Sequence, residues 1–412
     1  MSLFEIFAAL ITLTAGFAWV NERLLRMPTT IGVMVMALAT SLVLIGIHAL
    51  GVDLDRWAVE LLGAIEFDDA LLDGILSFLL FAGALHVDLD ALRTHRVVIA
   101  VLATVGLAIS TAIVGVALHF GLGWFGVELP FAYCLLFGAL ISPTDPVAVL
   151  AIFKKAGAPH DLETQVAGES LFNDGVAVVA FLAILAIATG AGEVSVAGTA
   201  SLLAKEVIGG VAFGLVTGGL AYALLARVDQ YHVEILVTLA LVAGGYALAH
   251  ALHVSAPIAI VVAGLLIGNH GRLLAMSERT RARLDDFWEL IDEILNAMLF
   301  VLIGLEVLVL PVPFESPLLV IAVIALTIVA RFVAIGLPMR ATPIRRNLAR
   351  GSVRLMTWAG LRGGISVAMA LSLPAGHERD LIVGLTYAVV VFSVIVQGLT
   401  IGPMVRRLTA TR

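Results

Sequence analysis

Apolar residues recur in long runs along the whole chain, separated by short polar segments. A membrane-spanning helix needs about 20 mostly apolar residues, and by that criterion the chain contains roughly 13 runs. They lie at 3–20, 29–49, 74–92, 97–119, 130–152, 166–190, 199–226, 233–252, 256–269, 288–310, 317–339, 355–374 and 381–405. The pattern predicts an all-α polytopic membrane protein.

The charged residues of the connecting segments predict how the chain is oriented. Every second connection is rich in arginine and lysine, whereas only Arg56, Lys205 and Arg379 fall in the others. Basic residues mark the cytoplasmic side of a membrane. We therefore expect the N-terminus outside and the C-terminus in the cytoplasm, in the inner (cytoplasmic) membrane of a bacterial-type cell. The longest outer segment, 51–73, is rich in acids, and we interpret it as a solvated loop, with concentration of cations at an entrance as the alternative.

Two of the predicted helices contain residues that break helices. Pro143 and Pro146 interrupt the fifth helix, and Gly360, Gly363 and Gly364 interrupt the twelfth. This spacing is expected if helices 1–6 and 8–13 form two inverted six-helix repeats whose broken helices, 5 and 12, cross. Broken helices at matching positions of two halves indicate a transporter's binding site near the middle of the membrane. We expect one transmembrane domain, 1–412, made of repeat one (about 3–190), a linker helix (about 199–226) and repeat two (about 233–405).

Composition excludes several other classes of protein. Hydrophobic residues make up 61% of the chain, charged residues 13%, and the mean hydropathy is +1.07; soluble domains are about 45–50% apolar and 25% charged. One cysteine excludes an internal disulfide and a cysteine-rich metal site. No basic arm predicts a nucleic-acid partner, and no lysine follows a glycine as a nucleotide-binding Walker A motif requires. We expect no cofactor, and the lipid bilayer as the surroundings.

The sixth predicted helix carries the polar residues best suited to bind an ion. An ionised side chain in the middle of a membrane costs about 2.5–3.5 kcal/mol, so one that lies there needs a partner or a task. Ser170 and Asp174 share one helix face, and Glu169 and Asn173 share the next. Their oxygens are hard ligands for a small cation, and Asp145, in the broken fifth helix, adds a carboxylate beside free backbone carbonyls. The alternatives are that Asp174 only holds helices together and that Asp145 caps the second half-helix.

Three further ionisable residues lie in predicted helices. We expect Arg362 to pair with Glu169, because a carboxylate–guanidinium pair keeps both charges in the membrane at the lowest cost. That pairing leaves Asp145 and Asp174 for the ion. Arg331 is interpreted as a structural pair or as a side chain that extends to the cytoplasm, with a role in transport as the alternative. His86 is interpreted as a buried, hydrogen-bonded core residue, with pH sensing as the alternative.

Four motifs, taken together and in this order, resemble those of one family. They are Ser142-Pro143-Thr144-Asp145-Pro146, Glu169-Ser170-Leu171-Phe172-Asn173-Asp174-Gly175, Phe300-Val301-Leu302-Ile303-Gly304-Leu305-Glu306 and Gly360-Leu361-Arg362-Gly363-Gly364. The chain resembles, over nearly its whole length, sodium/proton exchangers of the NhaP/NHE branch of monovalent cation–proton antiporters. The resemblance implies a 13-helix fold of two inverted repeats, a homodimer, and a core that moves against a fixed dimerisation domain.

The resemblance also implies roles for individual residues. Asp174 would bind cation and proton alternately, with Asp145, Thr144 and Ser170 helping to coordinate the ion. The pair of Glu169 and Arg362 would be structural. An asparagine before the aspartate, here Asn173, goes with one-for-one, electroneutral exchange. The chain departs from the family at His86, where related sequences often carry a glutamate.

The expected function is therefore antiport of a monovalent cation, sodium or lithium, against protons by alternating access. Either ligand neutralises Asp174 and lets the core cross, whereas the empty, charged core stalls, so exchange proceeds without leak. Potassium/proton exchange on the same scaffold and a non-transporting membrane subunit remain alternatives. An enzyme is not expected: an intramembrane aspartyl protease needs Tyr-Asp and Gly-x-Gly-Asp motifs, but Thr144 and Asn173 precede the two aspartates.

Overall fold

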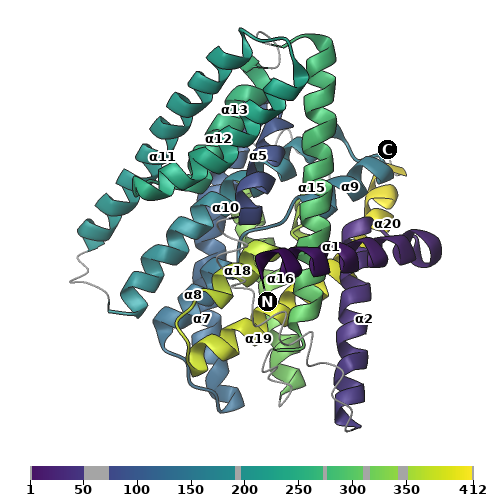
Figure 1. The fold of residues 1–412 in the computed structure, drawn as a ribbon. Coiled ribbons are helices and arrows are strands. Elements are labelled where there is room, and N and C mark those ends of the chain that lie inside the picture. Colours follow the sequence, from purple (N-terminus) through teal and green to yellow (C-terminus); the bar gives the residue numbers. More distant parts are fainter. Residues whose placement is uncertain are drawn as a thin grey trace.

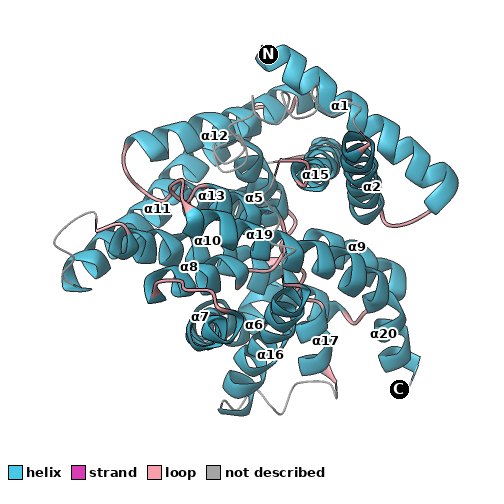
Figure 2. Ribbon diagram, turned by 90° about the horizontal axis from the view of Figure 1, so that it is seen from below, coloured by secondary structure: helices cyan, strands magenta, loops and turns pink. Residues whose placement is uncertain are grey.

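The computed structural model describes residues 2–50, 74–190, 196–271, 276–309, 316–341 and 351–410. Over these residues the chain is helical and contains no strand, as Figure 2 shows, which confirms the predicted all-α class. The acidic segment 51–73 lies outside the described residues. Each predicted apolar run overlaps a helix.

The helices are labelled in Figures 1 and 2 and have the following bounds. They are α1 (Leu3–Val20), α2 (Thr29–Ala49), α5 (Leu76–Leu85), α6 (Leu89–Val101), α7 (Leu107–Leu122), α8 (Phe131–Ile141), α9 (Val147–Ala156), α10 (His160–Ala188), α11 (Val196–Leu225), α12 (Tyr231–Ala251), α13 (Ala256–Leu266), α15 (Glu278–Glu306), α16 (Pro317–Ala341), α17 (Ser352–Trp358), α18 (Gly364–Leu371), α19 (His377–Phe392) and α20 (Gly398–Ala410). Short π-helical turns extend or join several of them, at Asn21–Leu25, Leu102–Gly106, Ile267–Gly271 and Ser393–Gln397.

Among the described residues, 8 helices are long and apolar enough to cross a membrane. Many of their large apolar side chains face outwards instead of inwards; on α11, Ile208, Val216 and Leu220 are each more than half exposed. An apolar surface of this extent is expected where lipid is the solvent. Several other predicted runs form shorter helices, because they are broken or interrupted by charge.

The helices pack as two groups. The α15 group consists of α1, α2, α5, α11, α12, α13 and α15, and the α10 group consists of α6 to α10 and α16 to α20. Helices pack closely within each group, and fewer contacts, such as those of α10 with α5 and of α15 with α18, join the two. The candidate site lies where these groups meet.

Small residues allow α11 to approach α13 closely. A Cβ atom added at Gly210 would lie 2.7 Å from the Ser255 carbonyl oxygen, and one at Gly218 would lie 3.1 Å from the Ala263 Cα. With Gly214 between them, these glycines follow one another at four-residue spacing, which predicts such close packing. They fix the shape of the α15 group and carry no chemistry.

The two predicted helix breaks are present. The first separates α8 from α9 between Ile141 and Val147, and the second separates α17 from α18 between Trp358 and Gly364. Proline supplies no N–H to continue the first helix, and clustered glycine weakens the second. Each span is therefore two half-helices, whose facing ends have backbone groups that no continuing helix can pair.

Candidate functional site

The two helix breaks contact one another directly. The backbone N–H of Asp145 donates a 2.8 Å hydrogen bond to the carbonyl oxygen of Leu361. Gly363 lies so close that a Cβ atom there would be 2.6 Å from Oδ2 of Asp145. A glycine is required at this position because any side chain would displace that carboxylate.

Arg362 stabilises the free end of α8. Its Nη1 atom donates to the carbonyl oxygens of Ser142 at 2.6 Å and Pro143 at 2.9 Å. Its backbone N–H donates to Ser393 Oγ at 3.0 Å. The last carbonyls of a helix carry partial negative charge, so the buried guanidinium neutralises the end of the half-helix.

The predicted partner of Glu169 is wrong. Arg331, and not Arg362, forms the ion pair: its two terminal nitrogens each donate to one carboxylate oxygen of Glu169. All three side chains are buried, and Arg362 is close enough for its charge to act on both others. Gly360 makes room for this arrangement, since a Cβ atom there would lie 2.8 Å from Arg331 Nε.

Arg362 differs from the prediction because its hydrogen-bond acceptors are backbone carbonyl oxygens and not the Glu169 carboxylate. The sequence shows Arg362 beside a broken helix but does not show that carbonyl oxygens of the other break lie within its reach. Arg331 lies on α16, far from Glu169 in the chain, and structural pairing was one of its two interpretations. The structural interpretation of Arg331 therefore agrees with the ion pair that it forms with Glu169.

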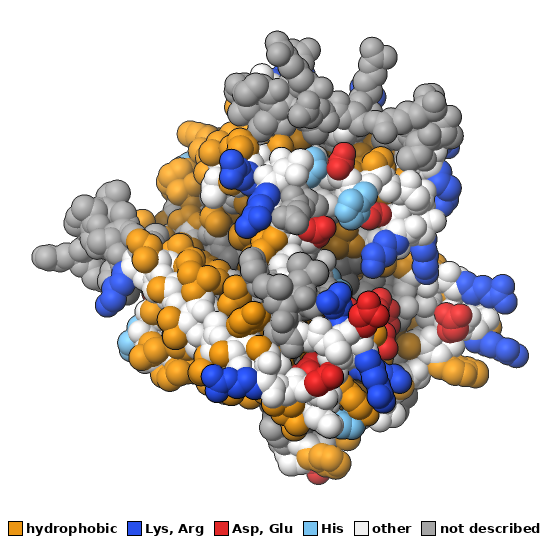
Figure 3. Space-filling model, turned by 90° about the horizontal axis from the view of Figure 1, so that it is seen from above, with side chains coloured by type: hydrophobic (Ala, Val, Ile, Leu, Met, Phe, Trp, Pro, Cys, Tyr) orange, Lys and Arg blue, Asp and Glu red, His pale blue; other side chains and the backbone are white. Residues whose placement is uncertain are grey.

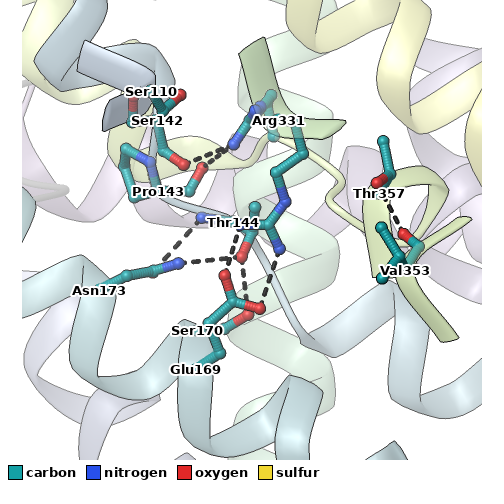
Figure 4. A network of polar contacts seen from close by, with 11 residues as sticks. Ser110, Ser142, Pro143, Thr144, Glu169, Ser170, Asn173, Arg331, Val353 and Thr357 are labelled. Atoms are coloured by element: carbon teal, nitrogen blue, oxygen red, sulfur yellow. Dashed lines mark hydrogen bonds and ion pairs between the residues drawn. The ribbon is translucent and has the colours of Figure 1, made fainter. Parts of the chain in front are cut away.

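Ser170 and Asn173 project from α10 towards Thr144 in the first break, as Figure 4 shows. Thr144 Oγ1 lies 2.9 Å from Ser170 Oγ and accepts a 3.1 Å hydrogen bond from Asn173 Nδ2. Asn173 Oδ1 in turn accepts a 3.4 Å hydrogen bond from the Thr144 backbone N–H. Both ends of the Asn173 amide are thus engaged with Thr144, which holds the break against α10.

A cavity of about 620 Å³ reaches the break and contains both candidate carboxylates. Asp174, Asp145 and Thr144 line it, whereas Ser170 and Asn173 lie behind Thr144. Asp174 is buried and makes no hydrogen bond or ion pair within the described part of the chain. Asp145 is near enough for its charge to act on Asp174.

One face of α10 forms a wall of this cavity. The lining residues His160, Glu163, Ala167, Leu171 and Asp174 recur every three or four positions, as one helix face does. From His160 to Asp174 the wall extends about 21 Å at 1.5 Å per residue. The exposed side chains of Lys154 and Lys155 lie among the lining residues, so the cavity opens at this end of α9 and α10.

The opposite wall contains residues that the sequence analysis missed. Glu289, Asp292, Glu293 and Asn296 of α15 all line the cavity. Their spacing of three and four places them on one helix face. This spacing is visible in the sequence. However, the acids lie at the start of the predicted apolar run, so they resemble the solvated end of an ordinary helix.

His86 lies at the cavity and is not buried. It caps the end of α5, its side chain is exposed, and its Nδ1 lies 2.7 Å from the carbonyl oxygen of Ala82. The predicted burial is therefore wrong, although the predicted hydrogen bond is present. The cause is the interruption of the helix directly after His86, which leaves the ring at the cavity wall.

The arrangement suits transient binding of a small cation. Within the described ranges no three His, Cys, Asp or Glu side chains are placed to hold a metal ion together. Two carboxylates and a threonine nevertheless line the cavity at two broken helices, and broken helices are where membrane transporters hold a passing ion. Fold and site together define a multi-pass secondary transporter for a cation.

Comparison with known proteins agrees with this class. The family model described as "Sodium/hydrogen exchanger, transmembrane" matches residues 8–407. The chain is 51% identical over 411 residues to the Na(+)/H(+) antiporter NhaP of Pseudomonas aeruginosa, covering 98% of this chain and 97% of that one. It is 34% identical over 391 residues to the Na(+)/H(+) antiporter NhaH of Halobacillus dabanensis, covering 94% and 93%.

The fold is that of a solved antiporter. The structure of the sodium proton antiporter MjNhaP1 from Methanocaldococcus jannaschii superposes with a TM-score of 0.78 at 18% identity, covering 99% of each chain. The chain belongs to the sodium/hydrogen exchanger family. The resemblance stated from the four motifs is confirmed.

Proposed function

We propose that this chain exchanges sodium ions for protons across the membrane, with Asp174 as the group that binds one or the other. The observation that carries the proposal is that Asp174 is buried, lacks a hydrogen bond or ion pair within the described residues, and yet lines a cavity. A buried charge without a partner is costly. Binding of sodium or of a proton neutralises the Asp174 carboxylate, so the two ions compete for one binding site.

The neighbours of Asp174 have distinct roles in this proposal. Asp145 and Thr144 line the cavity with Asp174 and supply oxygen ligands. Ser170 and Asn173 act through Thr144, whose hydroxyl they contact. Asn173 is then a positioning residue and not an ion ligand, a change from the role expected of its amide oxygen.

The direction of the cavity follows from the predicted topology. Lys154 and Lys155, at the open end, fall in a connection whose basic charge predicts the cytoplasm. The described conformation is then open to the inside, in the inner membrane, with the N-terminus outside. Figure 3 shows acidic and basic side chains close together on the face seen from above, as expected at a membrane surface.

Transport requires the cavity to close on this side and open on the other. The two helix groups meet at the site, so movement of the α10 group against the α15 group would carry Asp174 between the two sides. We propose that the α15 group is the fixed part and forms a homodimer with a second copy. The α10 group, with both broken helices, is the moving core.

The test is flux through the purified chain alone. Proteoliposomes that contain only this protein are expected to show proton efflux from an acidic lumen when external sodium is added. The same assay with lithium and potassium separates the sodium exchanger from a potassium exchanger. Absence of flux with every cation, in correctly folded protein, contradicts the proposal and supports a non-transporting subunit.

A further inference from the structure

The wall of the cavity opposite Asp174 carries its own oxygen-bearing side chains. Asp292 and Asn296 lie one turn apart on α15 and both line the cavity. Asp145 and Asp174 belong to the α10 group, whereas α15 is part of the other group. An ion in the cavity therefore faces carboxylates from both groups.

Asp292 lacks a basic partner in the described part of the chain, where it forms no ion pair. The charges that act on it are negative: Asp145 first, then Glu293 and Glu289. Like charges in one cavity repel each other and attract cations. The position therefore favours a cation between Asp292 and the broken helix.

Asn296 gives this position a second ligand. Its side chain is only 1% exposed, and its Nδ2 atom donates a 2.9 Å hydrogen bond to the backbone carbonyl oxygen of Asp292. That bond fixes the amide, leaving Oδ1 without a hydrogen bond among the described residues. Because Asn296 lines the cavity, this oxygen can meet water or a cation there.

We propose that Asp292, with the side-chain oxygen of Asn296, forms a first binding position for the incoming sodium ion, from which the ion passes to Asp145 and Asp174. The inference rests on the proposed exchange of sodium. A carboxylate and an amide oxygen are the hard ligands that this ion prefers, and water completes its coordination.

Asp292 belongs to the α15 group, and this location determines its role in transport. An ion held there is bound to the α15 group alone, so it must move to Asp174 before the core can carry it across. Asp292 therefore contributes to capture of the ion and not to the crossing step. Its loss is expected to raise KM for sodium and to leave kcat nearly unchanged.

The experiment compares two neighbouring acids of the same cavity in full-length protein. Asp292→Asn removes the carboxylate but keeps the backbone carbonyl that Asn296 contacts. Glu293→Gln removes one charge next to it from an exposed side chain and serves as the control. Sodium-dependent proton flux is measured in proteoliposomes at constant ionic strength, with choline replacing sodium, at neutral and at alkaline pH.

We expect Asp292→Asn to raise KM for sodium about tenfold, which corresponds to about 1.4 kcal/mol. Glu293→Gln should change KM by less than about twofold, because an exposed charge is screened, and Asp292→Glu should restore most of the affinity. The rise should persist at alkaline pH, where few protons compete. An unchanged KM, an equal rise in Glu293→Gln, or a rise confined to low pH overturns the inference. Absence of flux in the unmodified protein overturns the proposed function instead.

Discussion

Arg331 binds Glu169 with both terminal nitrogens of its guanidinium, although the two residues lie 162 positions apart in the chain. This pair joins α16 to α10 beside the first helix break. Removing one partner leaves a buried charge unpaired, at a cost of about 3–5 kcal/mol, whereas removing both costs less. Glu169→Gln and Arg331→Met should therefore each lower the thermal unfolding temperature in detergent, and the double variant should recover part of the loss.

The matched control is the pair that the sequence suggested first. Glu169→Gln combined with Arg362→Ala should recover much less, because Arg362 donates to carbonyl oxygens and acts on Glu169 only through its charge. If the unfolding temperature recovered in the double variant with Arg362→Ala, and the losses were strictly additive with Arg331→Met, Arg362 would be the partner of Glu169.

Asp174→Asn is expected to abolish sodium-driven proton flux while leaving the protein folded. The amide has nearly the shape of the carboxylate, but it can neither hold a proton for exchange nor neutralise an ion. Asp174→Glu keeps a titratable group that is longer by one methylene, so it should retain reduced flux. The measurement is proteoliposome flux alongside the thermal unfolding curve, and substantial flux in Asp174→Asn removes Asp174 from its central role.

The sequence predicts the fold and the breaks well, because both follow from local patterns. Apolar runs show the helices, and prolines and glycines show where Asp145 and Arg362 lie. Contacts between side chains that are far apart in the chain leave no local pattern in the sequence. Two buried arginines compete for one carboxylate, and only the three-dimensional arrangement shows that Arg331 reaches Glu169 while Arg362 reaches carbonyl oxygens. The α15 acids resemble a solvated helix end in the sequence, and only the packed structure shows that they line the same cavity as Asp174.

Gly363→Ala is expected to impair exchange by displacing Asp145. A Cβ atom at this position would lie 2.6 Å from Oδ2 and 2.7 Å from Cβ of Asp145, so the carboxylate must move. The neighbouring Gly364→Ala is the control, because its Cβ atom would lie closest to the side chain of Leu299 and not to a candidate ion ligand. We expect KM for sodium to rise several-fold in Gly363→Ala and little in Gly364→Ala; equal effects would mean that the position of Asp145 is unimportant.

Asn173→Ala should weaken sodium binding without removing the titrating group. The variant loses both hydrogen bonds to Thr144, so the break is less firmly held beside Asp174. Each lost neutral hydrogen bond contributes about 0.5–1.5 kcal/mol, which predicts a rise in KM of roughly tenfold for two bonds. Asn173→Asp can still accept from the Thr144 N–H and should retain more affinity than Asn173→Ala; the reverse order would contradict a positioning role.

The last prediction concerns the charge that each half-cycle moves. Glu169 and Arg331 neutralise each other, and Arg362 keeps one positive charge, held by carbonyl oxygens. These charges are the same whether Asp174 carries sodium or a proton, and Asp145 adds a constant charge if it stays ionised in both states. The two half-cycles then move equal charge in opposite directions, so exchange should be one-for-one and independent of membrane voltage. Flux is measured in proteoliposomes with the potential clamped by potassium and valinomycin, after potassium has been shown not to be a substrate. A rate that changes several-fold with the imposed potential would mean that Asp145 also exchanges its proton, and that two protons move per cation.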